Sequence, residues 1–160
     1  MRVLAVRQPW ASMIAMGYKT MEIRSRDTKI LDENFGLYAS RTKPKNSEIE
    51  HCLDWVERHY GSFPNIERLF YDLPRGKILG ITMIKNSTRF YELDHFLSLQ
   101  KEHMNMLSQW KGPCFGWNLR NFYKFENPID FKATSVVWSH IDSNIINKHI
   151  VKHTSQLIRS

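Results

Sequence analysis

The stretch VRQPWASMIAMGYKTMEIRS, residues 6–25, carries the strongest signal for the fold of this chain. Pro9 can open a helix, because its fixed φ suits the first helical turn and its missing N–H costs nothing there. Gly17 is suited to end that helix, since glycine tolerates the left-handed conformation just past a helix C-terminus. We therefore expect a short helix over residues 11–16, entered through a corner at Pro9.

The residues that follow alternate in polarity. In residues 19–24, Met21 and Ile23 fall on one face of an extended chain, and Glu22 and Arg24 fall on the other. This pattern predicts a half-buried strand whose polar face ends in charge.

Outward from this stretch, hydrophobic patterning predicts further strands and helices. We expect strands at residues 3–6, 35–40, 77–84, 115–121 and 129–138. We expect helices at residues 47–60, 65–72 and 94–109, with a basic helical tail from residue 144. Short strands separated by Gly and Pro, with helices inserted between them, favour an α+β fold built on a small β-barrel over a doubly wound sheet.

Two local signals refine these elements. Ser47 with Glu50 three positions later matches a capping box, which predicts the start of the helix that follows. Gly80 interrupts an apolar strand, which predicts a β-bulge or the close approach of another backbone.

The size of the chain, 160 residues and 19.0 kDa, suits one domain with a substantial core. We assign residues 1–140 to that domain and residues 141–160 to the basic tail. No apolar run approaches the ~20 residues that a membrane span needs, and Arg7 interrupts the apolar N-terminus, so no signal peptide is expected. These features predict a soluble, cytoplasmic protein with no membrane partner. Cys52 and Cys114 are isolated, which favours reduced structural thiols.

Neither a cofactor nor a metal site is predicted. The chain has no P-loop, no dinucleotide-binding motif and no nucleophile elbow. His149 and His153 have the i, i+4 spacing of a zinc pair, but no acidic residue of the metalloprotease kind separates them. A solvated tail helix is the favoured interpretation of this pair.

The net charge favours a polyanionic partner. Lys and Arg number 23 against 16 Asp and Glu, which gives +7, and residues 1–46 hold nine of the basic and four of the acidic residues. A concentrated positive field attracts nucleic acid, the commonest intracellular polyanion. The alternative is a solvated face that serves solubility alone.

Two sequence blocks, QPWA at residues 8–11 and GYKTMEIR at residues 17–24, occur together at a specific separation. With them the chain resembles the ASCH domain family over roughly residues 3–138. Similar to that family's central and closing strands are GKILG, GWNLRN and NPI at residues 76–80, 116–121 and 127–129.

The resemblance implies a PUA-like β-barrel with helices packed at its side. It also implies a cleft between the tryptophan corner and the charged strand, and RNA binding as the function. A ribonuclease activity is reported within the family, and another branch hydrolyses the amide of acetylcytidine. That branch uses a lysine, a threonine three positions later and a distant glutamate. Lys19 matches the lysine, but Glu22 stands in place of the threonine.

The residues of the two blocks have roles that suit nucleotide binding. Trp10 can stack on a base or act as a buried wedge, and Gln8 can contact a base edge or cap the turn. Glu22 can accept from an exocyclic amino group, and Arg24 can face a phosphate or form an ion pair with Glu22. Lys19 can bind phosphate or, with a lowered pKa, act as a base.

Further candidates supply positive charge or hydrogen bonds around such a cleft. The remaining nucleic-acid-binding candidates are Arg26, Ser40, Arg41, Lys43, Lys45 and Asn118.

Three functions follow from these observations. The leading hypothesis is an RNA-binding module whose cleft holds a base or nucleotide beside a basic rim. The second is an enzyme, a ribonuclease or an amidohydrolase on a modified nucleoside, with Lys19 and Glu22 as the catalytic acid–base pair. The third is a protein-interaction adaptor that uses the same surface.

Overall fold

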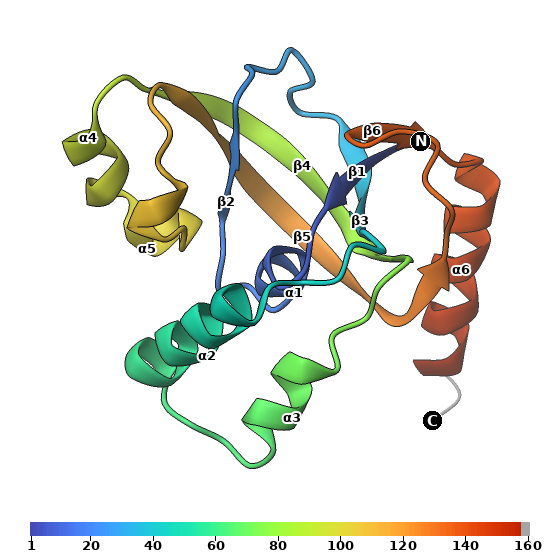
Figure 1. Ribbon diagram of the computed structural model, residues 1–160. Coiled ribbons are helices and arrows are strands. Elements are labelled where there is room, and N and C mark those ends of the chain that lie inside the picture. The colour runs from blue at the N-terminus through green and yellow to red at the C-terminus, as the bar shows by residue number, and fades with distance from the viewer. Residues whose placement is uncertain (158–160) are drawn as a thin grey trace.

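The computed structural model describes residues 1–157, and the side chains of residues 1–150 (Figure 1). Within that range one sheet contains β1 (Arg2–Val6), β2 (Met21–Arg24), β3 (Asn34–Ala39), β4 (Lys77–Phe90), β5 (Cys114–Asp130) and β6 (Trp138–His140). The helical elements are α1 (Trp10–Ala15), α2 (Asn46–Tyr60), α3 (Ile66–Tyr71), α4 (Leu93–Ser98), α5 (Gln100–His103), η1 (Leu107–Gln109) and α6 (Ser143–Leu157). The side chain of His153, one of the two tail histidines, lies outside the described residues.

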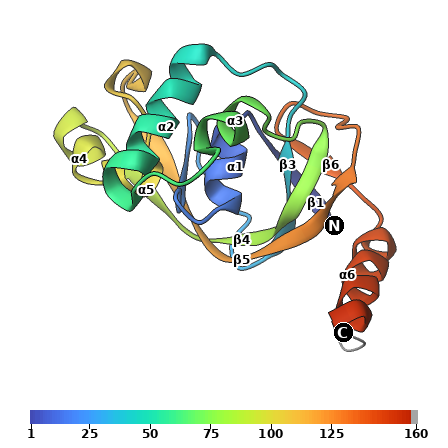
Figure 2. The same ribbon diagram turned by 90° about the horizontal axis from the view of Figure 1, so that it is seen from below.

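The strands lie in the order β2-β5-β4-β3-β1-β6, with β1 and β3 parallel and the other neighbours antiparallel. The α+β class predicted from the sequence is confirmed. The predicted barrel is not confirmed, because within the described residues β2 and β6 remain the edges of a curved, open sheet (Figure 2).

A side chain links the edge strand β2 to β1, on the side of the sheet where a closed barrel would have a backbone ladder. Arg24 of β2 donates from Nη2 to the carbonyl oxygen of Ala5 in β1 at 2.7 Å. The N–H of the same alanine binds the carbonyl of Val137, just before β6 begins. At Ala5, where β6 no longer runs beside β1, the Arg24 side chain therefore binds the backbone carbonyl of β1.

The main core fills the concave side of the sheet. α1 packs against β3, β4 and β5, and Figure 2 shows it covered by α2 and α3. Met13 of α1, Cys52 of α2 and Phe70 of α3 are all buried in this core. The start of α1 is held in place by this packing, whereas Met21 of β2 packs in a separate cluster with Phe90 and Phe96.

A second cluster covers the other face of the sheet. Here Val3, Tyr38 and Phe125 from three strands meet Ile146 of α6, which is fully buried. Residues 141–160 are predicted as a separate tail, yet α6 packs on the sheet through this side chain. Among the described helices, none has both the length and the apolar character to cross a bilayer.

The helix predicted over residues 94–109 is wrong, because the segment divides into α4, α5 and η1. Leu99 leaves helical geometry between α4 and α5, and Met104 adopts a left-handed φ of 58° directly after α5. His103 is fully buried at this break, with Nε2 at 2.8 Å from the carbonyl oxygen of Phe96. A buried polar hydrogen bond thus outweighs the amphipathic periodicity of the segment.

The strand predicted over residues 129–138 is also wrong. β5 continues to Asp130, and residues 131–137 form the loop to β6. Pro128 does not end the strand, because β5 pairs with β2 only up to Asn118 and is an edge beyond it. On an edge strand the missing N–H of proline costs no ladder hydrogen bond.

The predicted capping box is wrong as well. α2 begins one residue earlier than expected, with Lys45 at the N-cap position and no capping side-chain hydrogen bond in the described structure. Glu48 of its first turn is buried, and its Oε1 forms an ion pair with Nη2 of Arg7 at 3.2 Å.

The predicted irregularity at Gly80 is confirmed. The register between β4 and β5 shifts between Ile78 and Gly80. A Cβ atom added at Gly80 would overlap the carbonyl oxygen of Tyr123 and lie 3.1 Å from the Cα atom of Lys124. The backbone of β5 therefore approaches too closely for any side chain at this position.

We expect Gly80→Ala to lower the free energy of unfolding by about 3 kcal/mol, because strand backbone rather than a flexible side chain must move. Urea-induced unfolding measures the change. Gly36→Ala is the matched control in the same sheet, since its Cβ would meet the Cγ2 atom of Ile78 at 3.2 Å. Equal losses in the two variants would contradict the close approach of β5.

Candidate functional site

A cavity of about 770 Å³ lies beside the C-terminal ends of β1 and β2. Its walls come from β1, α1, β2, the turn after β3, the segment after α5 and the loop between β5 and β6. Elements from both ends of the chain therefore build one hollow, at the place where the sheet does not close. The candidates from the sequence that line it are Trp10, Lys19, Glu22, Arg24, Ser40 and Arg41.

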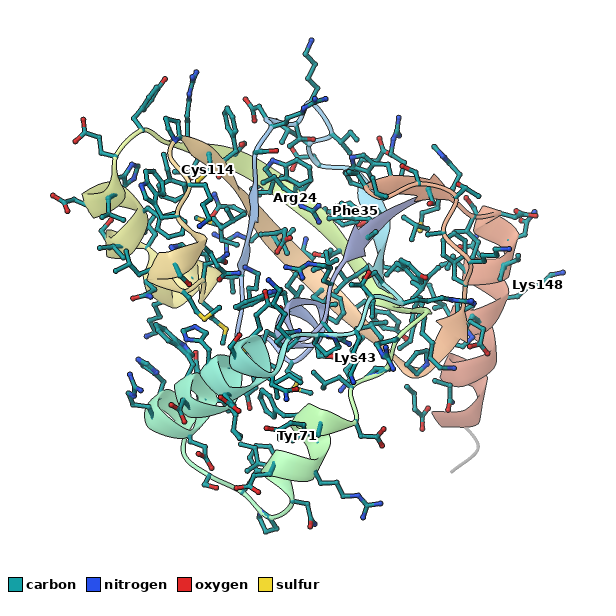
Figure 3. The ribbon with its side chains drawn as sticks, in the orientation of Figure 1. Arg24, Phe35, Lys43, Tyr71, Cys114 and Lys148 are labelled. Carbon is teal, nitrogen blue, oxygen red and sulfur yellow. The ribbon has the colours of Figure 1, made fainter. Side chains whose placement is uncertain are left out.

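The centre of the cavity wall is an ion triad on β2 and the turn before it. The carboxylate of Glu22 lies 3.4 Å from Nζ of Lys19 through Oε2, and 3.2 Å from Nη2 of Arg24 through Oε1. The predicted pairing of Glu22 with Arg24 is present in the structure. Figure 3 shows Arg24 between β2 and β1, where it also binds the Ala5 carbonyl. Two cations around one carboxylate leave this buried group with a net positive charge.

Lys19 is the most buried member of the triad, with 2% of its surface exposed. Its ammonium donates to the carbonyl oxygen of His103 at 2.6 Å and to Oδ1 of Asn105 at 3.1 Å. Burial lowers the pKa of Lys19, because desolvation penalises the charged amine, and the nearby Glu22 carboxylate opposes that effect. A lysine with a lowered pKa at a cavity wall has a property that suits a general base.

Trp10 is a buried part of the cavity wall and does not present an open surface for stacking. Only 5% of its surface is exposed, and the Lys19 ammonium lies 5.4 Å from the ring centroid. The ring also contacts the imidazole of His51 at a centroid distance of 6.2 Å. These contacts leave little of the indole face for stacking on a base.

His103 fixes the backbone that holds Lys19. The backbone N–H of Asn105 donates to its Nδ1 at 3.0 Å, so the neutral ring carries its proton on Nε2 and donates it to the Phe96 carbonyl. Burial lowers the pKa of His103 to about 4, with a smaller lowering from Lys19 and an opposing effect of the Phe96 carbonyl. The imidazole is therefore a neutral structural anchor at neutral pH.

Gln8 is placed away from the cavity. It is fully buried, and its Nε2 donates to the hydroxyl of Ser12 at 2.8 Å and to the carbonyl of Pro74 at 2.6 Å. Its Oε1 accepts from the backbone N–H of Ser12. All three contacts shape the corner that leads into α1, in agreement with the turn-capping alternative.

The other candidates lie outside the cavity wall as well. Arg26, Lys43 and Lys45 are exposed on loops, and Figure 3 shows Lys43 on the segment between β3 and α2. Asn118 is half-buried on β5, where its Nδ2 donates to Oδ1 of Asn86 at 2.6 Å and to the hydroxyl of Thr88 at 3.0 Å. It serves the pairing of β4 and β5.

Several lining residues had no signal in the sequence that pointed to them. Lys132 and Ser135 lie on the loop that replaces the predicted final strand. Asn105 and Gln109 lie in the segment predicted as one helix, and Arg7 precedes the corner. Only the correct break points of the first two segments would have brought four of these side chains to the site, Arg7 being the exception.

The electrostatics of the wall are strongly positive. Among the described residues, five cationic side chains and one carboxylate line the cavity. The hydroxyl of Ser40 and Nε of Arg24 are buried there without a hydrogen-bond partner in the described structure. Buried polar atoms without partners are rare and costly, by about 1–3 kcal/mol each. The site therefore has the charge and the vacant hydrogen-bonding capacity to receive an anionic ligand.

The charged strand and most of the cavity wall lie within a segment that is recognisable by sequence. Residues 4–129 match the family model of the ASCH domain. The chain belongs to the ASCH domain family. The resemblance seen in the sequence blocks of this ASCH domain is thereby confirmed, and a search of curated proteins finds no match.

Solved structures share the fold of this ASCH domain. The crystal structure of ASCH from Zymomonas mobilis has a TM-score of 0.60 and 13% identity, and covers 94% of this chain and 93% of that chain. Structures of two mutant forms of that protein have TM-scores of 0.60 and 0.56 at 13% and 12% identity. They cover 94% of this chain, and 94% and 96% of their own. At such identity the likeness concerns the fold alone.

Proposed function

We propose that this ASCH domain binds single-stranded RNA and holds one nucleotide in the cavity. The observation that carries the proposal is the ratio of five cationic side chains to one carboxylate around a hollow of about 770 Å³. Pockets of this size accommodate drug-sized ligands, and a nucleotide is of that class. Single-stranded nucleic acid is the form whose bases can be turned out into such a site.

The phosphates are expected at the exposed cations. Arg7, Arg41 and Lys132 are exposed at the cavity mouth, where they can contact phosphates without desolvating themselves. Arg24 lies deeper, with Nη2 committed to Glu22 and to the Ala5 carbonyl. The buried Glu22 carboxylate therefore orients the inner cations rather than contacting a base directly.

The base is expected to be recognised by amides and hydroxyls. Asn105 and Gln109 line the cavity and are both half-buried. Their amide oxygens accept from Lys19 and from the backbone N–H of Met106, so each amide offers its NH₂ donors to a base edge. Ser135 adds a hydroxyl from the loop before β6. These residues take the role that the sequence analysis gave to Gln8.

We expect Arg41→Gln and Lys132→Gln each to weaken binding of a labelled RNA oligomer. Each variant should also reduce the slope of log affinity against log salt by about 0.7, the value for one phosphate contact in a single strand. Fluorescence anisotropy at several salt concentrations measures both quantities. Arg58→Gln is the matched control, because Arg58 is exposed on α2 outside the cavity.

A salt slope that stays unchanged in both variants would contradict the phosphate contacts. If neither RNA nor free nucleosides bind, the adaptor hypothesis replaces the RNA-binding one. Comparison with DNA oligomers of the same sequence tests whether ribose is required, since the 2′-hydroxyl distinguishes the two.

A second candidate function is hydrolysis of RNA or of a modified nucleoside. The lowered pKa of Lys19 at the cavity wall favours it, with Lys19 as base and Glu22 as its acidic partner. Against it, Glu22 stands where the acetylcytidine-hydrolysing branch has a threonine, and both of its oxygens are engaged by cations. Release of cytidine from acetylcytidine, or of fragments from RNA, would establish it if Lys19→Met abolished the turnover.

A further inference from the structure

A second group of side chains lies on the same face of the sheet as the cavity triad, beyond the cavity itself. Arg89 of β4 is exposed, with its guanidinium 4.5 Å from the ring centroid of Tyr91 and 5.4 Å from that of Phe115. Tyr91 is 61% exposed and follows β4 directly. We call these three residues the arginine–aromatic cluster.

Strand register connects this cluster to the cavity. Phe115 of β5 is paired with Arg24 of β2 on one side and with Arg89 of β4 on the other. Directly paired residues project from the same face of a sheet, and neighbouring strands are about 4.8 Å apart. Arg24 and Arg89 are therefore separated by one intervening strand, β5, or about 10 Å between their backbones.

An exposed basic residue lies between the two groups. The backbone carbonyl of Arg26 accepts from Nε1 of Trp117 at 3.2 Å, so the chain leaving β2 crosses β5 at this point. The carboxylate of the next residue, Asp27, lies near Ser87 of β4 and accepts from the backbone N–H of Thr28 at 2.8 Å, and both lower the pKa of this carboxyl. Its negative charge is thus already hydrogen-bonded, and the side chain of Arg26 remains exposed.

We propose that the arginine–aromatic cluster is a second RNA subsite, which binds the nucleotides flanking the one in the cavity. A base can stack on Tyr91, whose ring is held by the guanidinium of Arg89, and the connecting phosphates can contact Arg26 and Arg89. Stacking platforms combined with basic residues are the usual means of holding single-stranded nucleic acid. The inference rests on the proposed function and extends its footprint from the cavity across β2, β5 and β4.

The experiment compares a dinucleotide with an octanucleotide of the same base composition. The intact protein should bind the octanucleotide more tightly, because only the longer RNA reaches both subsites. In Tyr91→Ala and Arg89→Gln the octanucleotide should bind about tenfold more weakly, the effect of losing one stacked base. The dinucleotide affinity should not change. Tyr71→Ala and Arg58→Gln are the matched controls, since Tyr71 is exposed on α3 (Figure 3) and Arg58 is exposed on α2.

The possible outcomes separate the two proposals. If the octanucleotide affinity of Tyr91→Ala equals that of Tyr71→Ala, the second subsite is wrong and the cavity proposal is unaffected. If Tyr91→Ala weakens the octanucleotide while Lys132→Gln has no effect on either RNA, the cavity proposal is wrong and the cluster stands as the binding surface. Absence of binding to both RNAs would overturn both.

Discussion

Replacing Glu22 by glutamine is expected to lower the free energy of unfolding by about 3–5 kcal/mol. The substitution keeps the size of the side chain but removes the one negative charge between Lys19 and Arg24. Lys19 would then be buried, and Arg24 half-buried, without a counter-charge, and the cost of an uncompensated buried charge is large because the interior screens it poorly. Chemical denaturation at neutral pH, followed by tryptophan fluorescence, measures the loss.

The control for this prediction is a pair of the same chemistry at the surface. Asp130 binds Lys77 at 2.8 Å, but its side chain is 88% exposed. Asp130→Asn should therefore leave the unfolding midpoint nearly unchanged. If Glu22→Gln were as stable as Asp130→Asn, the triad would be solvated in solution. The claim that the cavity wall holds buried positive charge would then be wrong.

Acidification from about pH 6.5 to about pH 4 is expected to destabilise the fold by about 3 kcal/mol through His103 alone. Burial lowers the pKa of this ring from 6.5 to about 4 in the folded protein, so the unfolded chain takes up a proton first as the pH falls. Stability is then fully present above the unfolded pKa and is lost toward the folded pKa. Thermal unfolding at a series of pH values measures the slope.

His103→Gln should remove most of that slope. A glutamine amide can donate to the Phe96 carbonyl and accept from the Asn105 N–H, and so can replace the two bonds of the neutral ring without titrating. His95→Gln, an exposed histidine on α4, is the control and should keep the slope of the parent protein. Identical slopes in all three proteins would contradict the burial of His103.

Local sequence was sufficient for two of the predictions, although the equally local capping-box signal at Ser47 failed. Alternation over β2 correctly placed Glu22 and Arg24 on one face, and their proximity to Lys19 follows from spacing within a few residues. Gly80 was recognisable because few arrangements require glycine inside an apolar strand. The family resemblance then located the cavity wall around these residues, and six of the candidate side chains line it.

The predictions fail where contacts between distant segments determine the boundaries of helices and strands. The break after His103 depends on a hydrogen bond to the Phe96 carbonyl within a packed fold, while the periodicity of the segment favours a continuous helix. The continuation of β5 past Pro128 depends on the shortness of β2, which no local pattern encodes. Lys132 and Asn105 were missed because both follow such misplaced boundaries. The sequence left the role of Gln8 open between base contact and turn capping, because one of its partners, Pro74, is remote in sequence.

The strand order has a consequence for folding during synthesis. β1 is flanked by β3 and β6, and Arg2 of β1 pairs with His140 of β6. Likewise β2 pairs with β5, which is distant in sequence. Pairing between such remote segments slows folding, because long loops must close before the contacts form. During synthesis β1 therefore leaves the ribosome early but gains its last neighbour only when residues 138–140 emerge. A chain that stalls before that point presents an unpaired apolar strand edge, the kind of surface that nucleates aggregation.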